Sequence, residues 1–295
     1  MRYTTLILIL AVLVGCGPKR SNTAVQSADT AVVLNPEQEV QYILDHYWDG
    51  FDFDNTEALK ELNREEIVYA ISQFVSIMPV EEADSRMREL IRRASTSHDM
   101  LDYFYTVCEI VLHNPNSPLR NDEYYIPVLE ELVASPLLNE YERIAPAYDL
   151  EIALKNRIGR VATNFIYTLE DGTEGKLHDI RANYTILMFS NPECPLCGEI
   201  MRQITSSQLL SALIQHGVVK VLTLYPDEDI SIWRKHIDNI PSEWIRAYDK
   251  GQMLSKERLY NLNAIPALYL LDRDKRVIIK DGTSVTEIEN VLMHN

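Results

Sequence analysis

Two cysteines three positions apart, Cys194 and Cys197, are the residues whose type and spacing point to chemistry. Such a pair can cycle between dithiol and disulfide, because one thiolate attacks a disulfide and the other then displaces the bound partner. Zinc ribbons use the same spacing but need a second pair of ligands. Cys108 lies far upstream, and no His stands within a few residues of Cys197. The pattern therefore favours redox chemistry over a zinc site or two inert core cysteines.

The segments around the pair predict how it is held. The run 185–189 is apolar on both faces, which is typical of a strand in the middle of a sheet, and a turn at Asn191 ends it. Apolar residues then recur at helical spacing from Pro195 onward. On the first turn of this helix, unpaired N–H groups and the helix dipole stabilise a thiolate. We predict that Cys194 attacks and that Cys197, one turn deeper, resolves.

The first residues have the pattern of an export signal. An apolar run, Leu6–Val14, follows a basic residue and is too short to span a bilayer. The tetrad Leu-Val-Gly-Cys that ends at Cys16 resembles the lipobox of bacterial lipoproteins. The resemblance implies a signal peptide over 1–15, cleavage before Cys16, acylation of that cysteine, and a polar tether over 16–34. The alternative is an ordinary secreted protein in which Cys16 is a spare thiol.

Export sets the expected surroundings of the dithiol. Because no acidic run follows Cys16, we expect a lipoprotein anchored in the outer membrane and facing the periplasm, with the cell surface as the alternative. Outside the cytoplasm, a close cysteine pair is oxidised unless something reduces it, so an upstream redox partner is expected. The formal net charge of −16 disfavours nucleic acid as a partner and gives no basic surface for anionic lipid.

The period of the hydrophobic pattern divides the chain near Asn156. Residues 35–156 predict an all-α domain that contains no catalytic constellation and for which we expect a role in partner recognition or dimerisation. Residues 157–295 alternate short strands with helices, so the fold class is α+β with two domains, all-α followed by α/β. The predicted helices of the first domain cover 57–78, 87–112, 123–141 and 144–155.

The second domain is predicted to contain short strands and helices in alternation. A hairpin begins with the strand 165–169, and the dithiol helix, which extends to about Gln215, is followed by a second buried strand over 218–225. The remaining elements are a helix over 230–237, a strand over 244–248, a helix over 255–262, a strand over 267–271, its hairpin partner over 277–280, and a last helix after Ser284.

The order of these elements resembles the thioredoxin fold, and specifically the anchored extracytoplasmic thiol-disulfide oxidoreductases of the TlpA and ResA type. The resemblance covers roughly Ile158 to Met293. It implies that Pro266 is cis and that, together with Ile265, it flanks the dithiol and offers backbone to an extended substrate segment. The alternative is a trans-proline that only starts a strand. The segment 46–54 resembles the start of a helical domain of unknown function that precedes such domains in exported lipoproteins.

Two residues depart from the family pattern. Glu193 replaces the aromatic residue that commonly precedes the first cysteine, and Met188 replaces a buried carboxylate used for proton transfer. Glu199 is the substitute proton acceptor that the sequence offers, with a plain solvated glutamate as the alternative. Glu193 disfavours a thiolate at Cys194 whereas the helix start favours it, so the redox potential stays open.

We therefore expect a membrane-anchored thiol-disulfide oxidoreductase, reductase or isomerase, that acts on exported protein thiols and disulfides and needs no cofactor. Two alternatives stay open: a binding module that kept the fold without turnover, and a metal carrier that uses the dithiolate.

Overall fold

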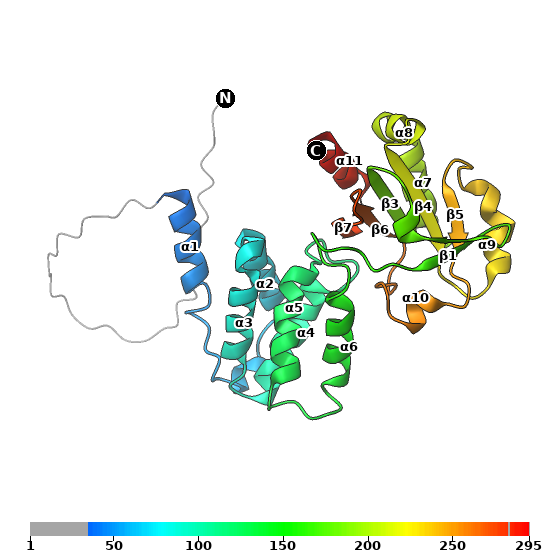
Figure 1. The fold of residues 1–295 in the computed structure, drawn as a ribbon. Coiled ribbons are helices and arrows are strands. Elements are labelled where there is room, and N and C mark those ends of the chain that lie inside the picture. Colours follow the sequence, from blue (N-terminus) through cyan, green and yellow to red (C-terminus); the bar gives the residue numbers. More distant parts are fainter. Residues whose placement is uncertain (1–34, 283, 295) are drawn as a thin grey trace, which may run out of the picture.

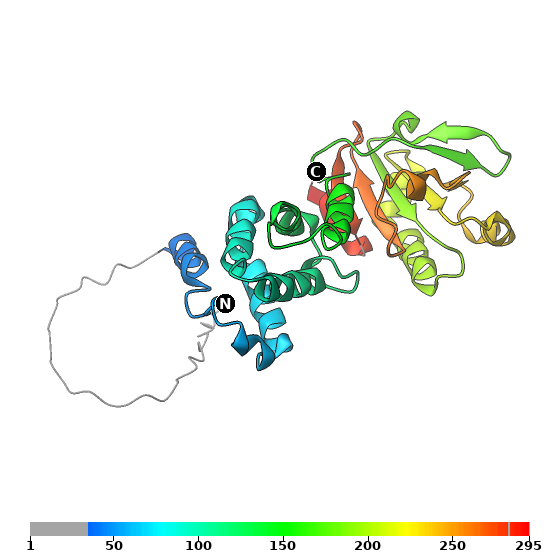
Figure 2. The ribbon, with the colours of Figure 1, turned by 90° about the horizontal axis from the view of Figure 1, so that it is seen from below.

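The structure is a computed structural model that describes residues 35–282 and 284–294. The chain forms a helical body followed by a body built on one sheet, side by side in both views (Figure 1, Figure 2). The α+β fold class is thus confirmed. The predicted signal peptide, the tether and Cys16 lie outside the described residues. Within the described part, no helix combines the length and apolar character that crossing a bilayer requires.

The helical body contains α1 to α6, and side-chain caps explain where several of them begin. Ser97, at the start of α4, accepts a hydrogen bond from the N–H of Met100, so the helix predicted over 87–112 is in fact two helices. Asn121 caps α5 in the same way, and α5 ends before the predicted residue 141. The helices are α1 (Pro36–His46), α2 (Arg64–Ile77), α3 (Ala83–Ala94), α4 (His98–Leu112), α5 (Asp122–Ala134) and α6 (Ile144–Ala153), and 3₁₀ turns cover Glu57–Lys60 and Val80–Glu82.

Aromatic rings from the loop after α1 fill the core of this body. Trp48 packs edge-on against Phe74 and Phe104, with ring centroids 5.7 and 5.8 Å apart. Burying each ring contributes on the order of 2–3 kcal/mol. Cys108 is fully buried in the same core, and burial raises the pKa of its thiol to about 12. It is therefore a structural cysteine.

The second body is a seven-stranded mixed sheet of order β2-β1-β5-β4-β3-β6-β7. Leu187 and Phe189 of β3 face one hydrophobic cluster, and Ile186 and Met188 face another, which α7, α8 and α11 cover. The expected burial of both faces is confirmed. The strands are β1 (Ile166–Leu169), β2 (Glu174–Lys176), β3 (Tyr184–Phe189), β4 (Val219–Tyr225), β5 (Ile245–Tyr248), β6 (Ala267–Leu271) and β7 (Val277–Gly282). The helices are α7 (Pro195–Ser206), α8 (Gln208–Gln215), α9 (Ile230–His236), α10 (Met253–Lys256) and α11 (Val285–His294).

Two predicted helices of this body are wrong in extent. The dithiol helix stops at Ser207, whose hydroxyl accepts a hydrogen bond from the N–H of Leu210 at 3.1 Å and starts α8. The helix predicted over 255–262 is the short α10, because Arg258 has a φ of 50° and a left-handed residue cannot continue an α-helix.

The segment that follows the helical body runs along the outer edge of β7. The N–H of Gly159 donates to the Val277 carbonyl, and the N–H of Val277 donates to the Arg160 carbonyl, both at 2.8 Å. Val161 bridges to Arg276 in antiparallel fashion. The outer backbone groups at the start of β7 are thereby paired within the chain.

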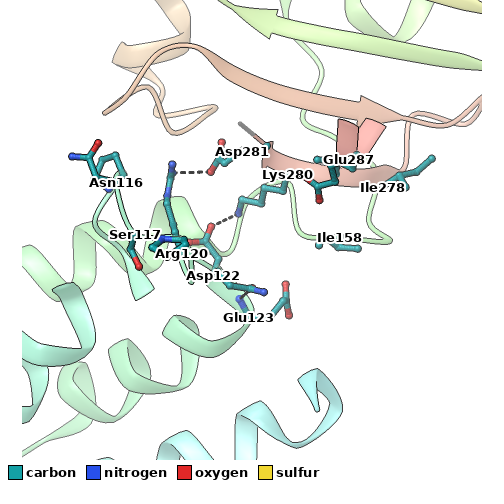
Figure 3. A pocket seen from close by; sticks show the side chains of 15 residues that line it. Asn116, Ser117, Arg120, Asp122, Glu123, Ile158, Ile278, Lys280, Asp281 and Glu287 are labelled. Atoms are coloured by element: carbon teal, nitrogen blue, oxygen red, sulfur yellow. Dashed lines mark hydrogen bonds and ion pairs between the residues drawn. The ribbon is translucent and has the colours of Figure 1, made fainter. Parts of the chain in front are cut away.

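Buried ion pairs join the two bodies around a cavity of about 390 Å³ (Figure 3). The Lys280 ammonium lies 2.6 Å from the Asp122 carboxylate, and both side chains are over nine-tenths buried. The same ammonium donates to the carbonyls of Ala153 and Lys155, at 2.9 and 2.7 Å, just beyond α6. Arg120 pairs with Asp281 at 3.0 Å. The helical body thus supplies the partners of two charged residues on β7.

Asp281 links this interface to the interior of the sheet. Its carboxylate accepts a 2.6 Å hydrogen bond from the Tyr269 hydroxyl. Burial raises the pKa of Asp281, and the charge of Arg120 opposes that shift. The predicted boundary residue, Asn156, is itself bound to the second body, since its side-chain amide donates to the Leu259 carbonyl at 2.8 Å.

Candidate active site

The dithiol follows the strand in the middle of the sheet. After β3 the chain turns at Asn191, whose carbonyl accepts a 3.0 Å hydrogen bond from the N–H of Cys194. The Asn191 side chain donates to Asp227, in the loop after β4, at 2.7 Å. Cys194 then caps α7 and Pro195 is its first residue, a position where a missing N–H leaves nothing unsatisfied. The turn at Asn191 and the carboxyl end of β3 together fix the position of the two cysteines.

The two thiols differ in depth, as their spacing predicts. Cys194 is partly exposed, whereas Cys197 is fully buried, and both are free thiols. Burial raises the pKa of Cys197 to about 12, and the neighbouring Cys194 acts in the same direction. A hydrogen bond with the Asn191 backbone opposes this rise. Cys197 is therefore protonated at neutral pH and can attack only after losing its proton.

The loop before β6 brings a backbone carbonyl to the first cysteine. The Ile265–Pro266 peptide bond is cis, which confirms the expectation from the resemblance. The Cys194 thiol donates to the Ile265 carbonyl, with Sγ and O 3.7 Å apart. Ala267, directly after Pro266, pairs with Phe189 in the antiparallel register of β6 and β3. The structure thus places the Ile265–Pro266 loop, which is distant in the sequence, beside Cys194 and Cys197.

Glu199 is not part of this group. Its carboxylate binds Arg202 and, at 2.9 Å, the Gln203 side chain along α7. No hydrogen bond joins it to either cysteine within residues 35–282 and 284–294. Two helical positions beyond Cys197 correspond to a rotation of roughly 200°, which turns a side chain to the opposite side of the helix. Its role as proton acceptor stays a prediction without support from the geometry.

Acidic residues beside the dithiol were missed by the sequence reasoning. The Tyr225 hydroxyl donates to the Asp229 carbonyl at 3.1 Å. Burial raises the pKa of Tyr225 to about 12, and the carboxylates of Asp227, Asp229 and Glu193 add to that rise. We call these three carboxylates the acidic rim. The run Asp-Glu-Asp after a buried strand was the available signal, since parallel strands end at one edge of the sheet.

A cavity of about 290 Å³ lies beside the dithiol helix, between α7 and α9. Its walls include Pro192 before the cysteines, Met201 on α7, and Trp233 and His236 on α9. In the described part of the chain, no three His, Cys, Asp or Glu side chains are grouped so that they could hold a metal ion.

Known proteins resemble both bodies of the chain. A family model described as a domain of unknown function (DUF5106) matches residues 27–156. A thioredoxin-like protein from Bacteroides caccae, solved by crystallography, is 37% identical, with 94% of this chain and 100% of that chain covered and a TM-score of 0.85. The C-terminal domain of an uncharacterized protein from Bacteroides fragilis is 39% identical, with 47% and 98% covered and a TM-score of 0.46.

Among curated proteins, the thiol-disulfide oxidoreductase ResA of Bacillus anthracis is 27% identical over 125 residues, which are 42% of this chain and 69% of the relative. The relative from Bacteroides caccae has the same two-body extent, since it is covered completely. The chain therefore belongs to the thioredoxin-like family of thiol-disulfide oxidoreductases, with a helical DUF5106 domain ahead of the dithiol domain.

Proposed function

We propose that this protein exchanges disulfides with exported proteins through Cys194 and Cys197. The observation that carries the proposal is the difference in depth between the thiols, with the attacking sulfur 3.7 Å from the Ile265 carbonyl and the other sulfur fully buried. A substrate can reach only the first thiol. The second is one helical turn away and interacts directly with Cys194, so it can attack a mixed disulfide formed there.

The reaction balances as a two-electron exchange. The Cys194 thiolate attacks one substrate sulfur, a mixed disulfide forms, and the other substrate sulfur leaves as a thiolate that takes up a proton. Cys197 loses its proton and attacks Cys194, which closes the Cys194–Cys197 disulfide and releases the second substrate thiolate. The substrate is reduced and the protein is oxidised. An upstream dithiol partner restores the reduced pair, and isomerisation follows if the released thiolate attacks a different substrate disulfide.

Two surfaces near the sulfur select the substrate in this proposal. The half-buried Ile265, before cis-Pro266, offers its backbone to an extended segment, because backbone at the end of a strand can pair with another strand. The acidic rim favours segments that carry Lys or Arg near the target cysteine, since opposite charges attract across a partly solvated gap.

Anchoring through Cys16 and a periplasm-facing location belong to the same proposal. They are supported by the lipobox-like tetrad and the apolar run before it. Cys16→Ser should move the protein from the membrane fraction to the soluble fraction and remove the acyl mass. If the variant stays with the membrane, the anchor lies elsewhere.

The direct test of activity is turnover of a disulfide substrate by the purified protein, together with the reduction potential of the pair. We expect reversible formation of the Cys194–Cys197 disulfide and catalysed reduction of insulin in the presence of a thiol reductant. If the disulfide forms but no turnover occurs, the protein is a binding module on the same fold.

A further inference from the structure

The end of the sheet opposite to the dithiol holds a cavity of about 590 Å³. β3 begins at this end with Tyr184 and reaches the dithiol end at Phe189. The walls of the cavity come from residues 180–183, from Gly217, and from residues 273–274 of the turn between β6 and β7. A space of this size fits a small organic molecule, and it is separate from every residue of the candidate active site.

Two arginines in its walls are free to bind a ligand. Arg181 and Arg273 are both exposed, and neither has an ion-pair or hydrogen-bond partner in the part of the chain that the structure describes. The net charge of −16 makes two unneutralised guanidinium groups at one cavity unusual for this protein. A guanidinium presents parallel N–H donors that match the oxygens of a phosphate or carboxylate.

A buried lysine lies behind the same turn. Lys275 is only 3% exposed, and its ammonium has no hydrogen-bond acceptor among the described residues. Burial lowers the pKa of Lys275, with Asp272 opposing the shift and the nearby Arg181 adding to it. An unpaired buried ammonium is costly, so an anion close to it would be stabilising.

The nearby carboxylates do not neutralise this charge. Asp272 is engaged in the turn, where it accepts hydrogen bonds from the N–H groups of Asp274 and Arg276, at 2.8 and 2.7 Å. Asp274 is the carboxylate that lines the cavity among the described residues, and like Asp272 it acts on Lys275 against the lowering of its pKa. The three cations Arg181, Arg273 and Lys275 still outnumber the two anions Asp272 and Asp274.

We propose that this cavity binds the phosphate group of a small phosphate ester between Arg181 and Arg273, with the charge of the nearby Lys275 adding to the attraction. A tetrahedral phosphate can accept from donors on several sides, whereas one arginine already satisfies a planar carboxylate. The remaining volume accommodates the glycerol or sugar to which the phosphate is attached. The ester is either a soluble metabolite or the headgroup of an anionic phospholipid, and the second source would hold the dithiol turned away from the membrane surface.

Titration calorimetry with glycerol 3-phosphate tests the soluble source, and co-sedimentation with phosphatidylglycerol vesicles tests the lipid source. Both experiments use the full chain carrying Cys16→Ser, so that an acyl anchor does not interfere. Sodium chloride at equal ionic strength is the blank. The double variant Arg181→Gln, Arg273→Gln removes both guanidinium groups. Arg160→Gln is the matched control, because Arg160 is exposed in the same domain and lies outside the cavity wall.

We expect the double variant to bind the effective probe at least about tenfold more weakly, a loss of about 1.4 kcal/mol, and the control to bind as the parent does. If either probe binds and the double variant binds it more weakly than Arg160→Gln does, the site is supported. The probe that binds shows whether the phosphate ester is a soluble molecule or a lipid headgroup. If neither probe binds at about 1 mM, or if the double variant and Arg160→Gln bind equally well, the proposal is overturned. The double variant should reduce insulin as fast as the parent does. Failure of the phosphate-binding proposal can therefore be told apart from failure of the proposed dithiol activity.

Discussion

The Sγ atom of Cys194 lies 3.7 Å from the carbonyl oxygen of Ile265, although the two residues are 71 positions apart in the sequence. This carbonyl is part of the backbone that we propose pairs with the substrate, so the attacking sulfur and the docking backbone share one point on the surface. A docked segment would then present its disulfide to Cys194 and not to the buried Cys197.

The two single-cysteine variants should therefore differ in whether they trap mixed disulfides. Cys197→Ser should accumulate mixed disulfides with exported proteins, because nothing displaces the partner from Cys194. Cys194→Ser should trap none, since Cys197 is fully buried. Non-reducing gels and mass spectrometry of the trapped species give the readout and name the substrates. Cys108→Ser is the control, and it should behave as the parent does; trapping by Cys194→Ser would reverse the assigned roles.

The raised pKa of Cys197 predicts how its reactivity depends on pH. In Cys194→Ser, alkylation of Cys197 should speed up about tenfold per pH unit from about pH 7 to 9, because burial, the largest cause of its raised pKa, remains in the variant and keeps the thiol mostly protonated there, although the contribution of Cys194 is lost. An ordinary cysteine levels off near its pKa of about 8.5. Mass spectrometry after timed iodoacetamide treatment measures the rate. A plateau below pH 9 would show that burial does not hold the thiol protonated.

Arg120→Gln should destabilise the protein because it leaves the Asp281 carboxylate buried without its cation. The expected loss is about 3 kcal/mol at pH 7. Since burial raises the pKa of Asp281, this group favours folding at low pH, and its contribution is lost as the pH rises through the folded-state pKa. The loss should therefore shrink as the pH is lowered from 7 to about 4, because protonation of this carboxyl removes the buried charge.

Urea denaturation of Arg120→Gln at both pH values measures this effect. Lys60→Gln is the matched control, since Lys60 and Glu57 form an exposed pair whose loss costs under about 1 kcal/mol. Adding Asp281→Asn to Arg120→Gln should restore part of the stability at pH 7. A loss that does not change with pH would mean that Asp281 is not the affected group.

A fragment from Arg157 onward should fold, because the sheet has its own hydrophobic clusters on both faces. It should also be less stable than the same domain in the full chain, since Lys280 and Asp281 lose Asp122 and Arg120. Circular dichroism and denaturation of the fragment and the full chain test this. Aggregation of the fragment, with the full chain soluble, would mean that the helical domain completes the core.

The acidic rim predicts a substrate preference. Glu193→Gln should raise the KM for a disulfide peptide with Lys beside its cysteine about twofold, because one exposed charge contributes about 0.5 kcal/mol. Any change in kcat should be the same for every peptide, since it reports the reactivity of the Cys194 thiol. The effect on KM should fade at high salt. A peptide with Glu at the same position should show no such increase. Glu140→Gln, on the exposed surface of the helical domain, is the control. An equal change in KM for both variants would show that the charge of Glu193 beside the dithiol has no specific effect on substrate binding.

Local chemistry explains what the sequence could predict. The place of the dithiol at a helix start follows from Pro195 and the apolar strand before it, which are all neighbours in the chain. The break at Ser207 and the left-handed Arg258 were missed, because apolar spacing alone continues through both positions. Arg120 could not be placed, since its partner Asp281 comes from a distant segment. Asp227 was missed although its place after a buried strand was a usable signal; its hydrogen bond with Asn191 again joins distant segments.

If the protein exchanges disulfides with exported proteins as we propose, the pairing of residues 159–161 with the start of β7 bears on how incompletely folded clients leave it. Such clients present extended segments with unsatisfied backbone groups, and an open sheet edge would template their addition as an extra strand. Because the chain already pairs its own backbone with the start of β7, a client strand cannot add at that position without displacing residues 159–161. Release after each round of exchange then depends on breaking the sulfur bond and the contacts around it, without competition from co-aggregation at β7.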